Sequence, residues 1–320
     1  MALPFTVVDA FTNKAFCGNP AAVIVLPSDH RYPDSILQSI ALEFNLSETA
    51  FVTAKPYSKA NLTSDYVSFG LRWFTPTDEV KLCGHATLGS ALVLYADPGL
   101  VSDHINEIRF STLSGTLVTR RIAGSSKIEL EFPVGNIVPA DEETMLDASA
   151  MIRKATGIQD LVVHFVGICD AAPYNAYLLI EIDPSIHLSS LKVDPGLLVR
   201  TRTQEGGTSR LDAHVQGSTT RPITVISNQK EGSTNDAGMG FNVRVFASLL
   251  GIPEDPVTGS ASSFAAKYWA ARANVGPGRV MEVSQVSHRG GELEVIWEEP
   301  SGTVKLRGNG RVASRGEIYL

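Results

Sequence analysis

A cysteine, a glycine and a histidine stand in a row at Cys83, Gly84 and His85, where the apolar run His85–Ala96 predicts a helix. The first N–H groups of a helix have no partner within the helix, and the helix dipole adds partial positive charge there. Glycine at this point lets a ligand approach the backbone closely. The stretch therefore predicts a helix start that binds a small carboxylate, with His85 placed to donate to the substrate or to shuttle a proton.

A second helix start of the same kind lies in the C-terminal half. The segment TGSASSFAAKYWA aligns with CGHATLGSALVLYA so that Thr258, Gly259 and Ser260 coincide with the Cys-Gly-His run. An acidic residue precedes each start, Glu79 in the first and Asp255 in the second. Thr258 and Ser260 are residue types that also cap helices, so ordinary capping is the alternative. Two matched starts indicate two related halves, and helices this apolar must each be buried within a sheet.

Two carboxylates are candidates for acid/base chemistry. Glu48 lies between a predicted helix and a predicted strand, among the apolar residues Leu46, Ala50 and Phe51. Burial raises the pKa of a carboxyl group, which would make Glu48 a proton carrier near neutral pH. Local capping is the alternative for this residue. Asp255 precedes a proline, which is common turn chemistry, but it could also orient an acid/base partner or hold a substrate amine or hydroxyl.

Cys83 offers a different chemistry, because a helix N-terminus favours a thiolate. A racemase that uses two cysteines needs a second thiol on the opposite face of the substrate. The residue that matches Cys83 in the second helix is Thr258, and the remaining cysteines, Cys17 and Cys169, lie in a predicted turn and a predicted strand. The thiol pair therefore lacks its second member. An amino-acid racemase or epimerase with Cys83 as one base stays an alternative, as does a binding protein that has the fold without the chemistry.

Composition and motifs exclude several other classes. The chain has 320 residues, 43% of them hydrophobic and 19% charged, which is typical of a globular protein. A net charge of -7 supplies no basic stripe for nucleic acid or an anionic membrane, and no run is long enough to span a bilayer. The seven histidines are scattered and no HExxH, P-loop, GxGxxG or GxSxG motif occurs, so no metal site is predicted. Three cysteines without a CxxC pair, and no signal peptide, predict a cytoplasmic protein.

The elements that must position these residues are mostly short strands. Strands are predicted at Phe5–Phe11 and Ala21–Pro27, and period-two segments follow the first apolar helix as a meander. The composition changes between Pro133 and Pro139, which predicts an N-terminal half at 1–133 and a C-terminal half at 134–320. The polar stretch Thr201–Arg221 is predicted to be a loop.

Taken together, these motifs resemble the phenazine-biosynthesis PhzF-like family, relatives of diaminopimelate epimerase. The matching segments are VDAFTNKAFCGNPAAVIVL, SETAFV, LRWFTPTDEVKLCGHATLGSA, VRVFASLLGIPEDPVTGSASS and the closing GNGRVASRGEIYL. The resemblance spans nearly the whole chain. It implies an α+β fold of two similar halves, each a barrel-like, mostly antiparallel sheet around a central helix, with the active site in the cleft between them. It further implies a cofactor-free homodimer, in which about the last 15 residues return to the N-terminal half.

The resemblance also implies a role for each candidate residue. The glutamate of SETAFV acts as the general acid/base in the family, and it falls on Glu48. The implied activity is a cofactor-independent isomerase that moves a proton on a small anionic metabolite. One departure lies in the late strands, where the family often has a Gln-Gly pair and a Gly-Arg-Pro run, whereas here Gln285 precedes valine and Arg289 precedes glycine. The other implied site residues are His85, Asp255 and Ser260 for positioning and proton relay, and Asn19, Cys83, Gly84, Thr258 and Gly259 for substrate binding.

Overall fold

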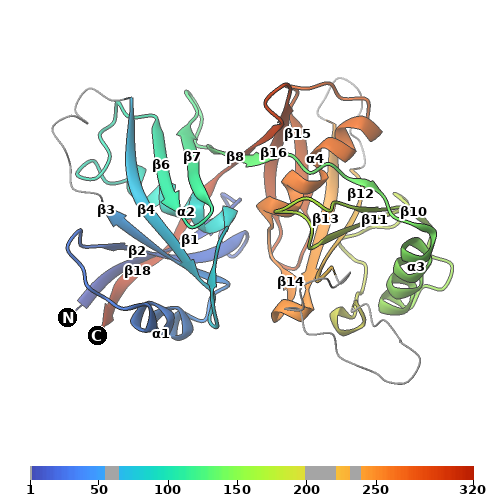
Figure 1. Cartoon of the computed structure of the whole chain (residues 1–320), viewed down its shortest axis with the longest axis horizontal. Coiled ribbons are helices and arrows are strands. Elements are labelled where there is room, and N and C mark those ends of the chain that lie inside the picture. The colour runs from blue at the N-terminus through green and yellow to red at the C-terminus, as the bar shows by residue number, and fades with distance from the viewer. Residues whose placement is uncertain (1, 55–64, 199–220, 231–238) are drawn as a thin grey trace. The chain divides into compact units, whose positions relative to one another are not determined.

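The computed structural model describes residues 2–54, 65–198, 221–230 and 239–320. All of the predicted loop Thr201–Arg221 except Arg221 lies outside these ranges. The chain forms two compact units (Figure 1). Unit 1 contains residues 1–132, 291–294 and 305–320, and unit 2 contains residues 133–290 and 295–304.

Unit 1 is a mixed sheet that surrounds one helix. Its strands β2 and β3 run parallel, as do β4 and β6, whereas β1–β2, β3–β4, β4–β5, β6–β7 and β7–β8 are antiparallel. Parallel neighbours require a crossover, which α1 and α2 supply. The elements are β1 (Ala2–Ala10), β2 (Asn19–Leu26), α1 (Asp34–Phe44), β3 (Glu48–Ala54), β4 (Tyr66–Phe74), β5 (Glu79–Val80), α2 (Gly84–Tyr95), β6 (Glu107–Thr112), β7 (Gly115–Arg121), β8 (Ile128–Pro133) and β18 (Gly310–Tyr319).

The end of the chain belongs to unit 1. Strand β18 pairs antiparallel with β1 from Ala2 opposite Tyr319 to Ala10 opposite Gly310. This pairing gives β1 a partner on each edge, because β2 lies on its other side. The first and last strands therefore close unit 1 together.

Unit 2 repeats the same succession of pairings. Strands β10–β11 are antiparallel, β11–β12 parallel, β12–β13 and β13–β14 antiparallel, and β13–β15 parallel, with α4 in the last crossover. Antiparallel pairs prevail in both units, and the α+β class predicted from the sequence is confirmed. The elements are β9 (Val138–Pro139), α3 (Glu142–Thr156), β10 (Val163–Ile168), β11 (Tyr177–Ile182), β12 (Ile223–Gln229), β13 (Gly240–Ala247), β14 (Ile252–Asp255), α4 (Gly259–Arg272), β15 (Met281–Gln285), β16 (Gly291–Glu298) and β17 (Thr303–Gly308), the last two shared with unit 1.

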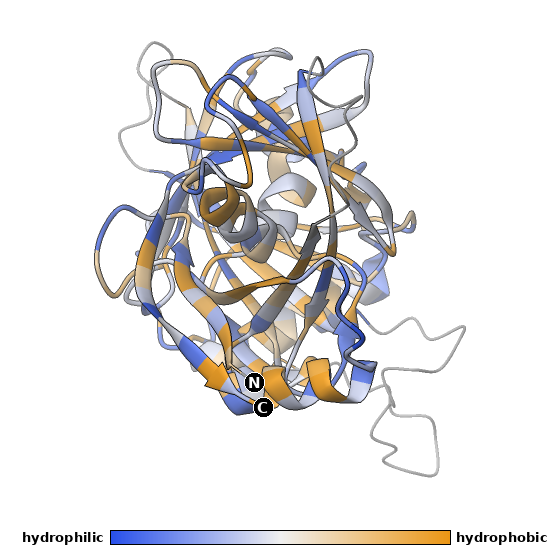
Figure 2. Cartoon of the chain, turned by 90° about the vertical axis from the view of Figure 1, so that its left-hand side faces the viewer, coloured by the Kyte–Doolittle hydropathy of each residue, from blue (hydrophilic) through white to orange (hydrophobic). Residues whose placement is uncertain are grey.

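Helix α2 forms the core of unit 1 because it is apolar on every side. Residues 84–91 are all buried, and the helix packs against β1, β2 and β3. Gly89 faces β1, and a Cβ atom added there would make ordinary van der Waals contact with Cβ of Val8 at 3.4 Å. Apolar and polar residues alternate along several of the surrounding strands, as expected for a sheet with one buried face (Figure 2). None of the helices in the described ranges has the length and apolar run needed to cross a membrane.

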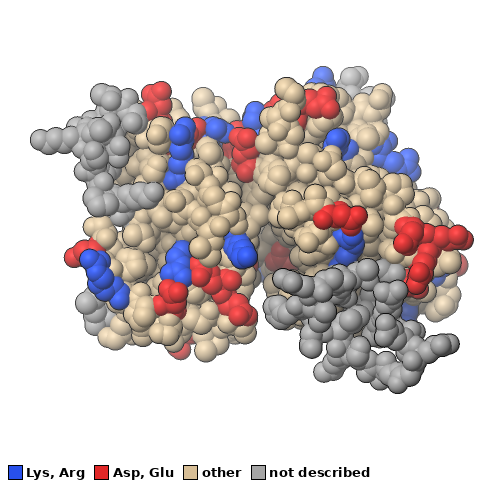
Figure 3. Space-filling view, viewed as in Figure 1, with Lys and Arg blue, Asp and Glu red and all other residues tan. Residues whose placement is uncertain are grey.

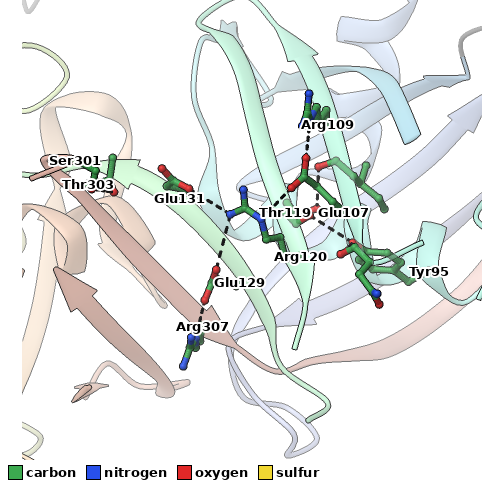
Figure 4. Close-up of polar contacts among 12 residues, drawn as sticks. Tyr95, Glu107, Arg109, Thr119, Arg120, Glu129, Glu131, Ser301, Thr303 and Arg307 are labelled. Atoms are coloured by element: carbon green, nitrogen blue, oxygen red, sulfur yellow. Dashed lines mark hydrogen bonds and ion pairs between the residues drawn. The ribbon is translucent and has the colours of Figure 1, made fainter. Parts of the chain in front are cut away.

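Charged side chains on the strands of unit 1 pair with one another. Arg120 lies 3.0 Å from Glu107 and 3.2 Å from Glu131, and Arg307 lies 2.8 Å from Glu129. Figures 3 and 4 show that basic side chains are interspersed with acidic ones on the visible face, and that Arg120 links several carboxylates. These pairs hold neighbouring strands β6, β7, β8 and β17 together through side chains as well as through the backbone.

Candidate active site

The start of α2 lacks a side-chain cap among the described residues. Cys83 is the N-cap residue and has an extended backbone, and Gly84 is the first helical residue. Both Cys83 and His85 are buried, each with 6% of its surface exposed. The sequence predicts that this helix start binds a carboxylate, and its N-cap side chain makes no capping hydrogen bond to the first turn.

Glu48 reaches this helix start from the beginning of β3. Its Oε2 atom lies 3.1 Å from Nε2 of His85, with 13% of the glutamate side chain and 7% of the histidine side chain exposed. Ser47 Oγ lies 3.3 Å from the same Nε2 and donates to Oδ1 of Asn19 at 3.2 Å. The parallel pairing of β2 with β3 sets Glu48 opposite Ala21, two residues beyond Asn19. Asn19 of β2, Glu48 of β3 and Ser47, which precedes β3, therefore converge on His85 of α2.

Cys83 occupies the other side of the His85 ring. Its Sγ atom lies 3.4 Å from Nδ1 of His85. One donor atom from each of Glu48, Cys83 and His85 lies within 4.8 Å of the other two. The sequence placed Cys83 beside His85, but the approach of Glu48 from a distant part of the chain arises from the sheet.

The electrostatics of this cluster correct one prediction. Burial would raise the pKa of Glu48, but the charge of His85, together with the side chains of Ser47 and Cys83, outweighs it, and the pKa lies below its usual value. The predicted upward shift of the Glu48 pKa is therefore wrong, because the His85 charge and the hydrogen bonds to the carboxylate together outweigh burial. Burial lowers the pKa of His85, but Cys83 and Glu48 more than offset this, and the pKa lies well above its usual value.

Cys83 is a thiol in this environment. Burial raises its pKa, and the neighbouring Glu48 carboxylate raises it further. Burial and the carboxylate together outweigh the His85 charge and the N–H groups of the helix start, both of which lower the pKa of Cys83. The sequence alone predicts a thiolate because it considers only the helix start. At neutral pH the cluster consists of a carboxylate, an imidazolium and a neutral thiol.

The start of α4 in unit 2 is held by its own set of hydrogen bonds. Thr258 is the N-cap residue, and its hydroxyl donates to the Asp255 carboxylate. Gln285, only 1% exposed, accepts from the Thr258 N–H at 2.7 Å and donates to the Asp255 carbonyl at 2.7 Å. Asp255 and Thr258 are therefore tied to each other and to β15. The sequence marked Gln285 only as a departure from a family pattern.

Ser260 has a partner that the sequence did not reveal. Its Oγ atom lies 2.8 Å from the hydroxyl of Tyr177, the first residue of β11. Gly259 is the first residue of α4 and is buried. Thr258, Gly259 and Ser260 thus lie at the beginning of α4, as Cys83, Gly84 and His85 lie at the beginning of α2. Asp255 is the last residue of β14 and accepts a hydrogen bond from the α4 N-cap.

Known proteins align with this chain over nearly its whole length. The family model of phenazine biosynthesis-like protein, PhzC-PhzF, matches residues 8–316. A phenazine biosynthesis-like domain-containing protein of Homo sapiens is 35% identical over 324 residues, covering 99% of each chain. An uncharacterized isomerase of Halalkalibacterium halodurans is 37% identical over 324 residues, covering 100% of each. A crystal structure of a PhzF-family phenazine biosynthesis protein from Enterococcus faecalis is 28% identical and covers 100% of both chains with a TM-score of 0.74.

Proposed function

Because the chain belongs to the PhzC-PhzF family of phenazine biosynthesis-like proteins, in which relatives are named isomerases, we propose that it is a cofactor-independent isomerase. Its substrate would be a small metabolite that carries a carboxylate, and Glu48 would move a proton on it. The observation that carries this proposal is the buried Glu48–His85 pair, with 3.1 Å between Oε2 and Nε2, beside the uncapped start of α2.

In the proposed reaction, Glu48 acts first as a general base. The carboxylate takes a proton from a carbon next to the substrate carboxylate or a conjugated system, and the electron pair of that C–H bond moves into the substrate. The N–H groups at the start of α2 and the His85 imidazolium stabilise the negative charge that develops. Glu48 then returns the proton to another carbon of the same molecule, so that no proton is gained or lost.

The lowered pKa of Glu48 makes these charge-stabilising groups necessary. A carboxylate with a low pKa is a weak base and removes a carbon-bound proton only if the resulting carbanion is strongly stabilised. Protonation of Glu48 also releases His85 from its ion pair. The imidazolium is then free to interact with the negative charge on the substrate.

The two units are proposed to be the two halves of an epimerase-like fold. The shared succession of strand pairings and the equivalent positions of α2 and α4 support this assignment. In this proposal Asp255 and Ser260, at the start of α4, hold the substrate. A cytoplasmic homodimer remains a prediction from the family resemblance.

A second candidate, an epimerase with Cys83 as one base, is supported by the 3.4 Å distance from Sγ to Nδ1 of His85. Two observations weigh against it. The pKa of Cys83 is raised, so the thiolate is scarce at neutral pH. The equivalent residue in α4 is Thr258, which cannot serve as a second thiol base.

The test uses solvent deuterium. The purified protein is incubated in D2O with a panel of unsaturated carboxylates, hydroxy acids and amino acids, and NMR follows incorporation of deuterium at carbon. The proposal expects exchange and isomerisation of at least one carboxylate. Turnover that survives in Cys83→Ser excludes Cys83 as the base. A turnover rate that falls by about 100-fold or more in Cys83→Ser supports the thiol mechanism. Ligands that bind but never exchange would show a binding protein instead.

A further inference from the structure

The hydroxyl of Ser260 forms its hydrogen bond outside its own helix. The hydroxyls of Thr87 and Ser90 in α2, and of Ser262 in α4, each donate to the backbone carbonyl of the residue four positions earlier. Ser260 Oγ instead lies 2.8 Å from the hydroxyl of Tyr177, the first residue of β11. The hydrogen bond of Ser260 therefore connects the helix start to the sheet of unit 2.

The position of Ser260 in the first turn of α4 explains this difference. Ser260 is the second residue of the helix, so the carbonyl four positions earlier belongs to Pro256, which precedes the helix. That carbonyl accepts from Ser287 Oγ at 2.7 Å. A bond back to it would hold the serine hydroxyl against its own backbone. The contact with Tyr177 instead keeps the hydroxyl at the helix start, where a ligand would bind.

Tyr177 is held rigidly where it meets Ser260. Tyr177 is 8% exposed, and its ring packs edge-on against Tyr174 with 5.7 Å between the centroids and against Phe264 of α4 with 5.2 Å between the centroids. The backbone N–H of Tyr177 donates to the Tyr174 carbonyl at 3.0 Å. A ring that packing already fixes can set the direction of a neighbouring serine hydroxyl at little further cost in conformational entropy.

The equivalent position in unit 1 is also held from the sheet. His85 is the second residue of α2, as Ser260 is of α4, and its Nε2 lies 3.1 Å from Oε2 of Glu48, the first residue of β3. The partner in unit 1 is a carboxylate that pairs with an imidazolium, whereas the partner in unit 2 is a phenol that pairs with a serine. Unit 2 therefore offers an oriented neutral donor, which suits an acceptor oxygen of a substrate.

We propose that Tyr177 is a positioning residue for the reaction. Tyr177 donates to Ser260 Oγ, so that the Ser260 proton points away from Tyr177 and donates to an oxygen of the substrate carboxylate. A hydroxyl that accepts one hydrogen bond donates a stronger one, and an ionised carboxylate accepts only. This role rests on the proposed function, in which Ser260 holds the substrate.

NMR of labelled tyrosine tests the hydrogen bond without a substrate. The full chain is labelled with ¹³C at Cζ of tyrosine, and Tyr177→Phe and Tyr174→Phe identify the resonances of these two rings. The inference expects the Tyr177 resonance to shift in Ser260→Ala and the Tyr174 resonance to stay in place, because the Tyr174 hydroxyl donates to the Pro133 carbonyl at 2.8 Å. An unchanged Tyr177 resonance in folded Ser260→Ala protein would overturn the inference.

Kinetics with a carboxylate that the wild-type chain isomerises test the role of the hydrogen bond. Tyr177→Phe removes only the hydroxyl, and KM should rise by about 3-fold to 10-fold with kcat nearly unchanged, since the lost interaction holds substrate and transition state alike. Ser260→Ala should raise KM at least as much. In the Ser260→Ala background, Tyr177→Phe should change KM by less than about 2-fold, because Tyr177 acts through Ser260. An effect of Tyr177→Phe that persists in full in this background would overturn the inference.

Tyr174→Phe is the matched control, because Tyr174 packs against Tyr177 in the same unit and is also buried. This variant should keep the wild-type KM, and far-UV circular dichroism verifies that every variant is folded. An equal rise in KM in Tyr174→Phe would show a general effect of packing and would overturn the assigned role of Tyr177.

The two proposals fail in different ways. If the wild-type chain exchanges none of the carboxylates in D2O, the proposed function is overturned, and the NMR experiment still decides whether Tyr177 orients Ser260. Exchange by the wild-type chain, together with a wild-type KM in Tyr177→Phe, would overturn the role of Tyr177 and leave the isomerase.

Discussion

A double-mutant cycle should reveal a strong energetic coupling between Glu48 and His85, because the two residues form an ion pair. At 3.1 Å, two opposite charges attract by about 5 kcal/mol for an effective dielectric constant of about 20. Desolvation of both groups opposes part of this energy, and an imidazole left alone can release its proton. We therefore expect a favourable coupling free energy of about 2 to 4 kcal/mol in a double-mutant cycle of Glu48→Gln and His85→Gln.

The assay must report on unit 1 alone, because a chain of two units need not unfold in one step. Hydrogen exchange of α2 peptides, measured by mass spectrometry, gives the free energy of opening of this core helix. The exposed pair His164–Asp183 of unit 2, with 3.0 Å between Nε2 and Oδ2, is the matched control, and hydrogen exchange of β10 peptides follows it. Its side chains are 35% and 31% exposed, so solvent screens the attraction and a much smaller coupling is expected.

The coupling should also depend on pH in a defined way. The pKa of Glu48 is lowered in the folded chain, so its contribution to stability is present above its unfolded pKa and is lost as pH falls through the folded value. The pKa of His85 is raised, so its contribution is complete below its unfolded pKa and is lost as pH rises through the folded value. A coupling that is absent at neutral pH, or constant from acid to alkaline pH, would refute the ion pair.

Two further predictions concern unit 2, and hydrogen exchange of α4 peptides measures both. Gln285→Ala removes the acceptor of the Thr258 N–H and a donor to the Asp255 carbonyl, and we expect the free energy of opening of α4 to fall by about 2 to 4 kcal/mol. A loss under about 0.5 kcal/mol would contradict the assigned role. Gly135→Ala would bring a Cβ atom to 2.5 Å from the Phe264 carbonyl oxygen and should cost about 1 to 3 kcal/mol, whereas Gly276→Ala, which has no atom within 4 Å, is the neutral control; equal stability of the two variants would contradict this packing.

The sequence predicted the parts of the site that depend on short stretches of chain. The glycine and histidine that follow Cys83, together with the apolar run behind them, indicate the α2 start without any tertiary information. The family resemblance placed Glu48 in the same site. The predicted direction of the Glu48 pKa shift is wrong because the shift depends on the distance to His85. The pairing of β2 with β3 and the position of α2 determine that distance.

Residues that act through distant partners left no local signal. Gln285 reaches the start of α4 from β15, 27 residues beyond Thr258 in the chain. Tyr177 reaches Ser260 across 83 residues. Neither contact can be inferred from neighbouring residues, since both depend on which strands lie beside the helix start.

The central claim, that Glu48 carries the proton, is tested most directly by solvent deuterium incorporation in Glu48→Gln. This variant keeps the size and shape of the side chain and removes the base, and circular dichroism and ligand titration verify that it folds and binds. The proposal predicts that exchange of a substrate identified with the wild-type chain falls by about 100-fold to 10,000-fold. Exchange at the wild-type rate in folded Glu48→Gln protein would contradict it.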